Sequence, residues 1–214
     1  MLTKGNCSSL VVDGLCDQTG GRDGPVTCFY FDFAARKEQS ATNMLGSLLK
    51  QMISGTRRIS EEILRALREQ KEAVSGRRPQ LVDIVKMLQL VTAGQRTYMC
   101  IDALDECTAA QRFRLFDSVE QILEKSPGTR MFVTGRPHIR AEIEKRLGRR
   151  VTSISVGPTR DDILSYFRAR MSEDETPDAM DESLEADILE KIMGGISEMC
   201  VIGVYGAENP IPCY

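Results

Sequence analysis

The stretch "YMCIDALDEC", residues Tyr98–Cys107, indicates both a fold and a candidate site. Its short apolar run ends at Ile101 and is followed by Asp102, and then by Asp105 and Glu106. The run predicts a short strand, and the carboxyl ends of strands in an open parallel sheet are where ligands bind. One carboxylate there can hold Mg²⁺, and an acid three or four residues later can orient a water molecule. The alternative is that these acids only cap the next helix.

Strands and helices alternate on both sides of this stretch. Strands are predicted at Val26–Phe33, Tyr98–Ile101, Met131–Thr134 and Val151–Val156, the first of them covered on both faces. Apolar residues every three to four positions predict helices at Ser8–Gln18, Ser40–Ile53, Ser60–Glu72, Leu81–Val91, Thr108–Leu123, Ile139–Leu147, Thr159–Met171 and Leu184–Ile192. "TAAQ" at Thr108 and "TRDD" at Thr159 have the spacing of helix caps. This order predicts an α/β protein with a mostly parallel sheet.

Composition narrows the classes of function. The chain has 214 residues and a net charge of −3 with both signs interspersed, which fits one domain or one with a short appendage and argues against nucleic acid and membrane as partners. Its seven cysteines are scattered and never form a C-x-x-C pair, which favours reduced thiols and a cytoplasmic location. The single histidine, His138, makes a His-rich metal centre or a Ser/His/Asp triad improbable.

The neighbours of "IDALDEC" carry a family resemblance. Upstream lies "FYFDFAARKEQSATNMLGSLLKQMI" and downstream "MFVTGRPHI". In this order the three motifs resemble the NACHT class of signal-transducing P-loop NTPases, in particular the fungal nephrocystin-like N-terminal module that often precedes ankyrin, tetratricopeptide or WD repeats. The resemblance covers roughly Ser8–Met199. It implies the P-loop NTPase-like three-layer fold, Mg²⁺ with ATP or GTP as cofactors, and protein partners or self-association in the full-length family.

The resemblance also implies roles for individual residues. Asp102 matches the Walker B aspartate that holds magnesium, and Asp105 and Glu106 match the acids after it, one of which positions the hydrolytic water. Arg136 in "TGRP" matches the arginine of the sensor-like segment that reads the γ-phosphate. The alternative for Arg136 is a surface cation in front of a helix that starts with proline.

The phosphate-binding loop is missing from the sequence. A P-loop needs G-x-x-x-x-G-K-[ST], and no such stretch is present. Alignment on the first helix places Lys4 where the P-loop lysine belongs, with Thr3 in place of the last glycine and Gly5 in place of the hydroxyl residue. Lys4 is therefore a coincidence or a remnant. The chain is expected to be a partial or degenerate nucleotide-binding module without hydrolytic activity, and the alternative is a non-enzymatic protein-interaction module.

The family resemblance also predicts the domain organisation. In the family, the strand before the P-loop lies in the middle of the sheet, between the fourth and fifth strands. Without it, the strands at Met131–Thr134 and Val151–Ile154 should either close on each other or expose backbone groups. We expect a partial NTPase-like domain over 1–172, an acidic linker and the start of a helical region over 173–199, and an irregular tail over 200–214. The pattern fades after "EKIMGGISEMC", which suggests a truncated gene product.

Overall fold

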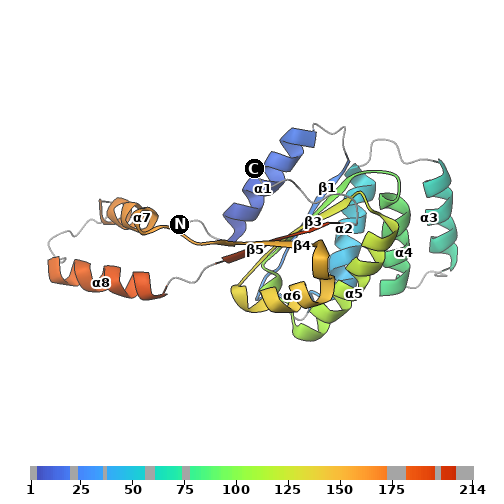
Figure 1. The fold of residues 1–214 in the computed structure, drawn as a ribbon. Helices are drawn as coiled ribbons and strands as arrows, with labels where there is room; N and C mark the ends of the chain where they lie inside the picture. The colour runs from blue at the N-terminus through green and yellow to red at the C-terminus, as the bar shows by residue number, and fades with distance from the viewer. Residues whose placement is uncertain are drawn as a thin grey trace.

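A five-stranded sheet organises the part of the chain that the structure, a computed structural model, describes: residues 4–19, 24–35, 38–55, 61–73, 78–172, 182–195 and 199–205. The strands are β1 (Val26–Tyr30), β2 (Thr97–Asp102), β3 (Thr129–Gly135), β4 (Val151–Val156) and β5 (Met199–Tyr205). Their order in space is β1-β2-β3-β5-β4 (Figure 1). β1, β2 and β3 are parallel, and β5 is antiparallel to both β3 and β4. The prediction of a mostly parallel α/β sheet is confirmed.

β5 corrects two expectations about the C-terminal part of the chain. An irregular tail over 200–214 is wrong for residues 200–205, which belong to β5, whereas residues 206–214 lie outside the described part. The strands β3 and β4 neither close on each other nor leave a gap, because β5 lies between them. Its register pairs Cys200 with Gly135 of β3 and Met199 with Val156 of β4. The backbone groups of the two strands are therefore paired through a segment far downstream in the chain.

The helices agree closely with the apolar periodicity of the sequence. They are α1 (Lys4–Thr19), α2 (Ala41–Gly55), α3 (Glu61–Ala73), α4 (Leu81–Thr92), α5 (Ala109–Lys125), α6 (Arg140–Leu147), α7 (Arg160–Ser172) and α8 (Glu182–Gly195). Short 3-10 turns occur at Leu104–Glu106, Pro137–Ile139 and Gly148–Arg150. The predicted cap of α5 is only half formed, since Thr108 accepts a hydrogen bond from the Gln111 amide while the Gln111 side chain accepts one from Ala41 of α2.

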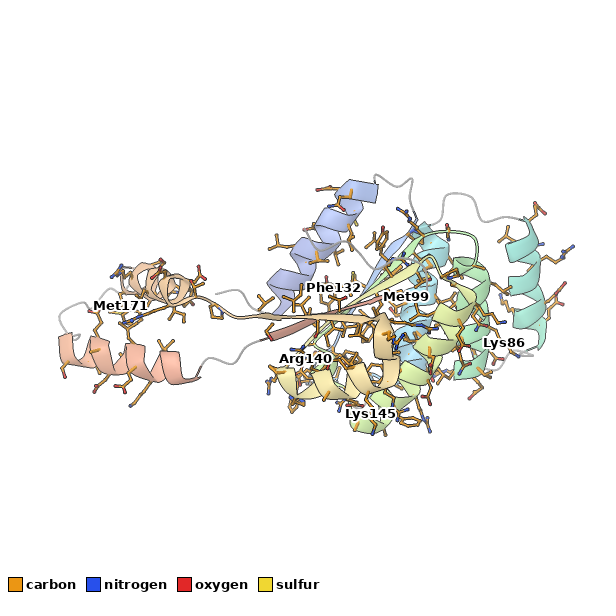
Figure 2. All side chains as sticks on the ribbon, in the orientation of Figure 1. Lys86, Met99, Phe132, Arg140, Lys145 and Met171 are labelled. Carbon is orange, nitrogen blue, oxygen red and sulfur yellow. The ribbon has the colours of Figure 1, made fainter. Side chains whose placement is uncertain are left out.

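The helices lie on both faces of the sheet. α2, α4, α5 and α6 cover one side, here called the helical face, and α1 crosses the other side over β1 and β2, here called the α1 face (Figure 1). Met99, labelled in Figure 2, lies on the helical face within the main core. The core also contains the apolar stripe of α2, formed by Met44, Leu45, Leu48, Leu49 and Met52. Burial of such a stripe is the main source of stability for an amphipathic helix.

β1 is shorter and less covered than predicted. The strand ends at Tyr30, three residues before Phe33, because Asp32 turns the chain by accepting a hydrogen bond from the Ala34 amide at 2.9 Å. Tyr30 is 42% exposed and Phe33 is 67% exposed. Burial on both faces is therefore wrong for the end of this segment.

Candidate functional site

The candidate site lies at the carboxyl edge of the sheet, where β2 and β3 end side by side. Parallel pairing matches Ile101 with Val133, so the residues after both strands emerge next to each other. Asp102 ends β2, and Arg136 follows β3 directly. The structure thus brings together residues that are more than thirty positions apart in the chain.

Asp102 is a buried carboxylate at the tip of a parallel strand. It is 6% exposed, and its Oδ1 accepts a hydrogen bond of 2.5 Å from the Thr134 hydroxyl. That hydroxyl in turn accepts the amide hydrogen of Ala103 at 3.0 Å. Thr134 therefore orients the carboxylate and fixes the backbone that leaves β2. The spacing of residues in the sequence did not indicate this role. The only available signal was that Thr134 lies at the end of a predicted strand.

Ala103 has an unusual backbone conformation. Its φ of 54° lies in the left-handed region, which L-residues other than Asn and Asp rarely occupy. The bond from its amide to Thr134 holds this conformation. The turn starts the 3-10 segment Leu104–Glu106 and directs Asp105 and Glu106 toward β3. An alanine at this position gives no sequence signal for a left-handed residue, so this feature could not be predicted.

Asp105 and Glu106 meet Arg136. The Asp105 side chain is 2% exposed, and its oxygens receive the Arg136 amide at 3.2 Å and the Arg136 Nε at 3.3 Å. The Arg136 Nη2 lies 3.9 Å from Glu106 Oε1. The Arg136 side chain is 56% exposed, so its outer part faces solvent. The second acid of the motif is thus held by a cation from the next strand.

Gly135 lies against Ile139 beside the Asp105 carboxylate. A Cβ on Gly135 would lie 2.4 Å from Ile139 Cδ1, far below contact distance, and 3.4 Å from Asp105 Oδ1, an ordinary van der Waals distance. A side chain at this position would therefore have to displace the tip of the Ile139 side chain, whereas the carboxylate would leave room for it. "TGRP" is in this sense a packing motif as well as a charge motif.

The first helix points its start toward the same edge. Ser9 forms a side-chain hydrogen bond with Tyr30 at the end of β1, and Cys16 lies near Cys28 further back along that strand. The N-terminal end of α1, where Lys4 begins the helix, is therefore nearer the carboxyl edge than its C-terminal end (Figure 1). The side chain of Lys4 lies outside the described part of the structure, and its predicted role stays a prediction.

Asp102 is the residue of this site that could bind the magnesium ion implied by the resemblance. Mg²⁺ is usually held by one or two carboxylates together with phosphate oxygens and waters, so a buried Asp102 oriented by a hydroxyl fits its chemistry. Within the described residues, no three His, Cys, Asp or Glu side chains form a group that could hold a metal. Any such ion at Asp102 would take its remaining ligands from a phosphate chain and water.

A thiol cluster under α1 has different chemistry. Cys28 and Cys100 are register partners on β1 and β2, and Cys16 of α1 lies close to both. Burial raises the pKa of Cys100 to about 12, and burial together with nearby Asp13 raises that of Cys16. A thiol with a raised pKa is a poor nucleophile and a poor metal ligand at neutral pH. Cys100 and the partly buried Cys28 are therefore packing residues, whereas Cys16 lies exposed on α1.

Together, these features define an open α/β domain with a mostly parallel sheet and acidic residues at its carboxyl edge. The sequence model of the family described as nephrocystin 3, N-terminal matches residues 3–136, which is more than half of the chain. The chain belongs to this family. The match ends at Arg136 and so contains the whole candidate site. No curated protein was found to match the chain. Among the described residues, no helix is both long and apolar enough to cross a bilayer.

Proposed function

We propose that this chain is a degenerate nucleotide-binding module of the NACHT type that retains the magnesium side of the site and does not hydrolyse ATP or GTP. The observation that supports it is the convergence of Asp102, Asp105, Glu106 and Arg136 at the end of β2 and β3. In this proposal Asp102 holds Mg²⁺ beneath the phosphates. Arg136 exchanges Asp105 and Glu106 for a phosphate oxygen when nucleotide binds, because guanidinium groups pair well with both kinds of anion.

The expected lack of hydrolysis follows from the sequence. Positioning and electrostatic stabilisation of the phosphates supply most of the catalysis in phosphoryl transfer. The sequence contains no glycine-rich loop with a lysine and a hydroxyl residue to provide them.

The test is titration of the purified chain with fluorescent ATP and GTP analogues, with and without Mg²⁺, alongside a phosphate-release assay. Asp102→Asn is the informative variant, since an amide oxygen can keep the Thr134 hydrogen bond while the charge is lost. Asp161→Asn, on exposed α7, is the matched control. We expect the nucleotide analogues to bind in a magnesium-dependent way, without phosphate release. Their affinity should fall about tenfold or more in Asp102→Asn, because a charged partner is lost, and should not change in the control. Turnover that Asp102→Ala abolishes would overturn the proposal.

A second function is favoured by the pairing of Arg136 with Asp105 and Glu106. These ion pairs neutralise the charges of the three side chains within the protein, as ion pairs with a purely structural role do. The chain would then act as a non-enzymatic protein-interaction module. Pull-down of protein partners with and without Mg·ATP separates the two functions. Partner binding that ignores nucleotide and the Asp102→Asn change would favour the interaction module.

A further inference from the structure

The two edges of the sheet are finished in different ways. At the β1 edge, the side-chain amide of Gln51 from α2 accepts the Cys28 amide hydrogen at 3.0 Å and donates to the Cys28 carbonyl at 2.8 Å. This amide covers the edge as a neighbouring strand would. At the other edge, β4 is the last strand, and no described strand pairs with its outer side.

The sequence of β4 lacks the features that normally protect an edge strand. "VTSISV" contains no charge, no proline and no glycine, and four of its six residues are β-branched. Natural edge strands are usually protected by Lys, Pro, bulges or a covering element. β4 runs along the near side of the sheet in Figure 2, and its Ile154 and Val156 are 59% and 38% exposed. An exposed apolar edge of this kind is a template for another strand.

The two faces of β4 differ. Ser153 points to the helical face, where its hydroxyl donates to Glu144 of α6 at 2.9 Å. Ile154 is paired in register with Val201 and lies on the α1 face, which α1 covers only over β1 and β2. Among the described residues, no helix covers the part of the sheet on which the apolar side chains of β4 stand, and their burial would be favourable.

We propose that β4 pairs antiparallel with β4 of a second copy of this chain, about a two-fold axis at Ile154. Residues opposite each other across an antiparallel pair must lie on the same face, which restricts the register. An axis at Ile154 places Ile154 opposite its own copy, Thr152 opposite Val156, and Ser153 opposite Ser155. The β-branched pairs then share the α1 face and the serines share the helical face.

The neighbouring registers have poorer pairs. An axis at Ser153 would place Arg150 opposite Val156 and separate the two isoleucines. An axis at Ser155 would also separate them, and it would place Thr152 opposite Pro158, which has no amide hydrogen to donate. Pairs of β-branched residues stabilise a sheet by a few tenths of a kcal/mol to about 1 kcal/mol each, whereas a cation opposite an apolar residue gains nothing comparable. The register centred on Ile154 is therefore preferred.

A second copy suits this edge better than an unrelated peptide. Strand addition to a foreign sheet takes its specificity from pockets for alternate side chains. β4 offers a short, nearly palindromic strand, which complements itself under two-fold symmetry. A single short strand forms an interface smaller than about 1,200 Å², so the dimer is weak and depends on concentration. This inference does not depend on nucleotide binding.

The first test is the oligomeric state of the whole chain, measured by analytical ultracentrifugation from about 1 to about 200 μM, the range in which small interfaces associate. Ile154→Lys places two like charges opposite each other at the axis and should raise the dimer dissociation constant at least about tenfold. Val82→Lys is the matched control, since Val82 of α4 is 56% exposed and distant from the sheet edge. A wild-type chain that stays monomeric throughout, or a dimer unaffected by Ile154→Lys, would refute the proposal.

The second test measures the register. Ile154→Cys places two thiols opposite each other, and diamide can take up their two hydrogen atoms as the disulfide forms. Val156→Cys is the control, because in this register the two copies of residue 156 are four positions out of alignment. We expect a 154–154 linked peptide by mass spectrometry and no 156–156 peptide, with the oxidised wild-type chain as background. Equal linkage in both variants would contradict the register and the proposal.

Discussion

At the residue scale, the candidate site depends on two buried carboxylates, Asp102 and Asp105, and on one half-exposed cation, Arg136. Asp105 is 2% exposed, and such a group is costly to bury unless it is paired. Arg136 supplies both a backbone amide and a guanidinium nitrogen. Asp102 and Asp105 could be selected from the sequence, because they follow the apolar run of β2, and Arg136 through the family resemblance of "TGRP". Thr134 and the left-handed Ala103 could not, since their roles exist only once β2 and β3 lie side by side.

The first prediction concerns this pair. Arg136→Ala keeps the backbone hydrogen bond to Asp105 but removes the cation from a buried carboxylate. We expect the free energy of unfolding to fall by about 1–2 kcal/mol, less than for a fully buried pair because Arg136 faces solvent. Urea unfolding followed by circular dichroism measures it.

The control for this prediction is Arg140→Ala. Arg140 pairs with Glu144 at 2.7 Å, but both side chains are almost half exposed. Its loss should change stability much less than the loss of Arg136, because solvent screens this exposed pair. Equal losses of stability in the two variants would show that the Arg136–Asp105 pair stabilises the fold no more than an exposed pair does.

At the element scale, local sequence accounts for most helix starts and ends. α7 begins with a reciprocal cap in which the Thr159 hydroxyl accepts the Asp162 amide at 3.2 Å and the Asp162 carboxylate accepts the Thr159 amide at 2.9 Å. "TRDD" predicted this cap, since the interacting groups are only three residues apart. The cap of α5 was only partly predictable, because Gln111 is drawn to the start of α2, seventy residues away.

The second prediction is the pH dependence of the α7 cap. Hydrogen bonds from the hydroxyl and amide of Thr159 lower the pKa of Asp162 below its ordinary value of 3.8. A lowered pKa means that the folded helix favours the carboxylate. The cap is therefore fully present above pH 3.8, and it is lost as the pH falls through the lower, folded value.

Carbon-detected NMR titration of the aspartate carboxyl groups measures this effect. Asp162 should titrate below the ordinary aspartate pKa of 3.8, and the Ile163 amide, which bonds to the Thr159 carbonyl, should respond with it. An Asp162 pKa at or above 3.8 would contradict the cap.

At the scale of the whole molecule, β5 joins parts of the chain that are distant in sequence. It pairs with β3 on one side and β4 on the other, and its Ile202 and Val204 are 0% and 1% exposed within the core. α7 and α8, which precede β5 in the chain, pack against each other and lie away from the sheet (Figure 1). The attachment of β4 to the rest of the sheet therefore depends on β5.

The third prediction tests that dependence. Ile202→Ala removes a fully buried side chain and should lower the free energy of unfolding by about 2–4 kcal/mol. Val201→Ala, half-buried on the α1 face of the same strand, should cost clearly less. Urea unfolding gives both values, and amide exchange should show faster opening of β4 in Ile202→Ala alone. Similar losses in the two variants would show that β5 is not anchored through the helical face.

The sequence by itself determined the elements and the neighbourhood of the site. Apolar periodicity and capping are local properties, so α2, α4 and β2 could be located, as could the acids after β2 and the arginine after β3. The tertiary structure was needed to show that β5 lies between β3 and β4 and runs antiparallel to both. It likewise decided that Arg136 pairs with Asp105 across thirty-one residues. These are long-range contacts whose partners depend on how loops close and which backbone groups remain unpaired. No local pattern contains that information.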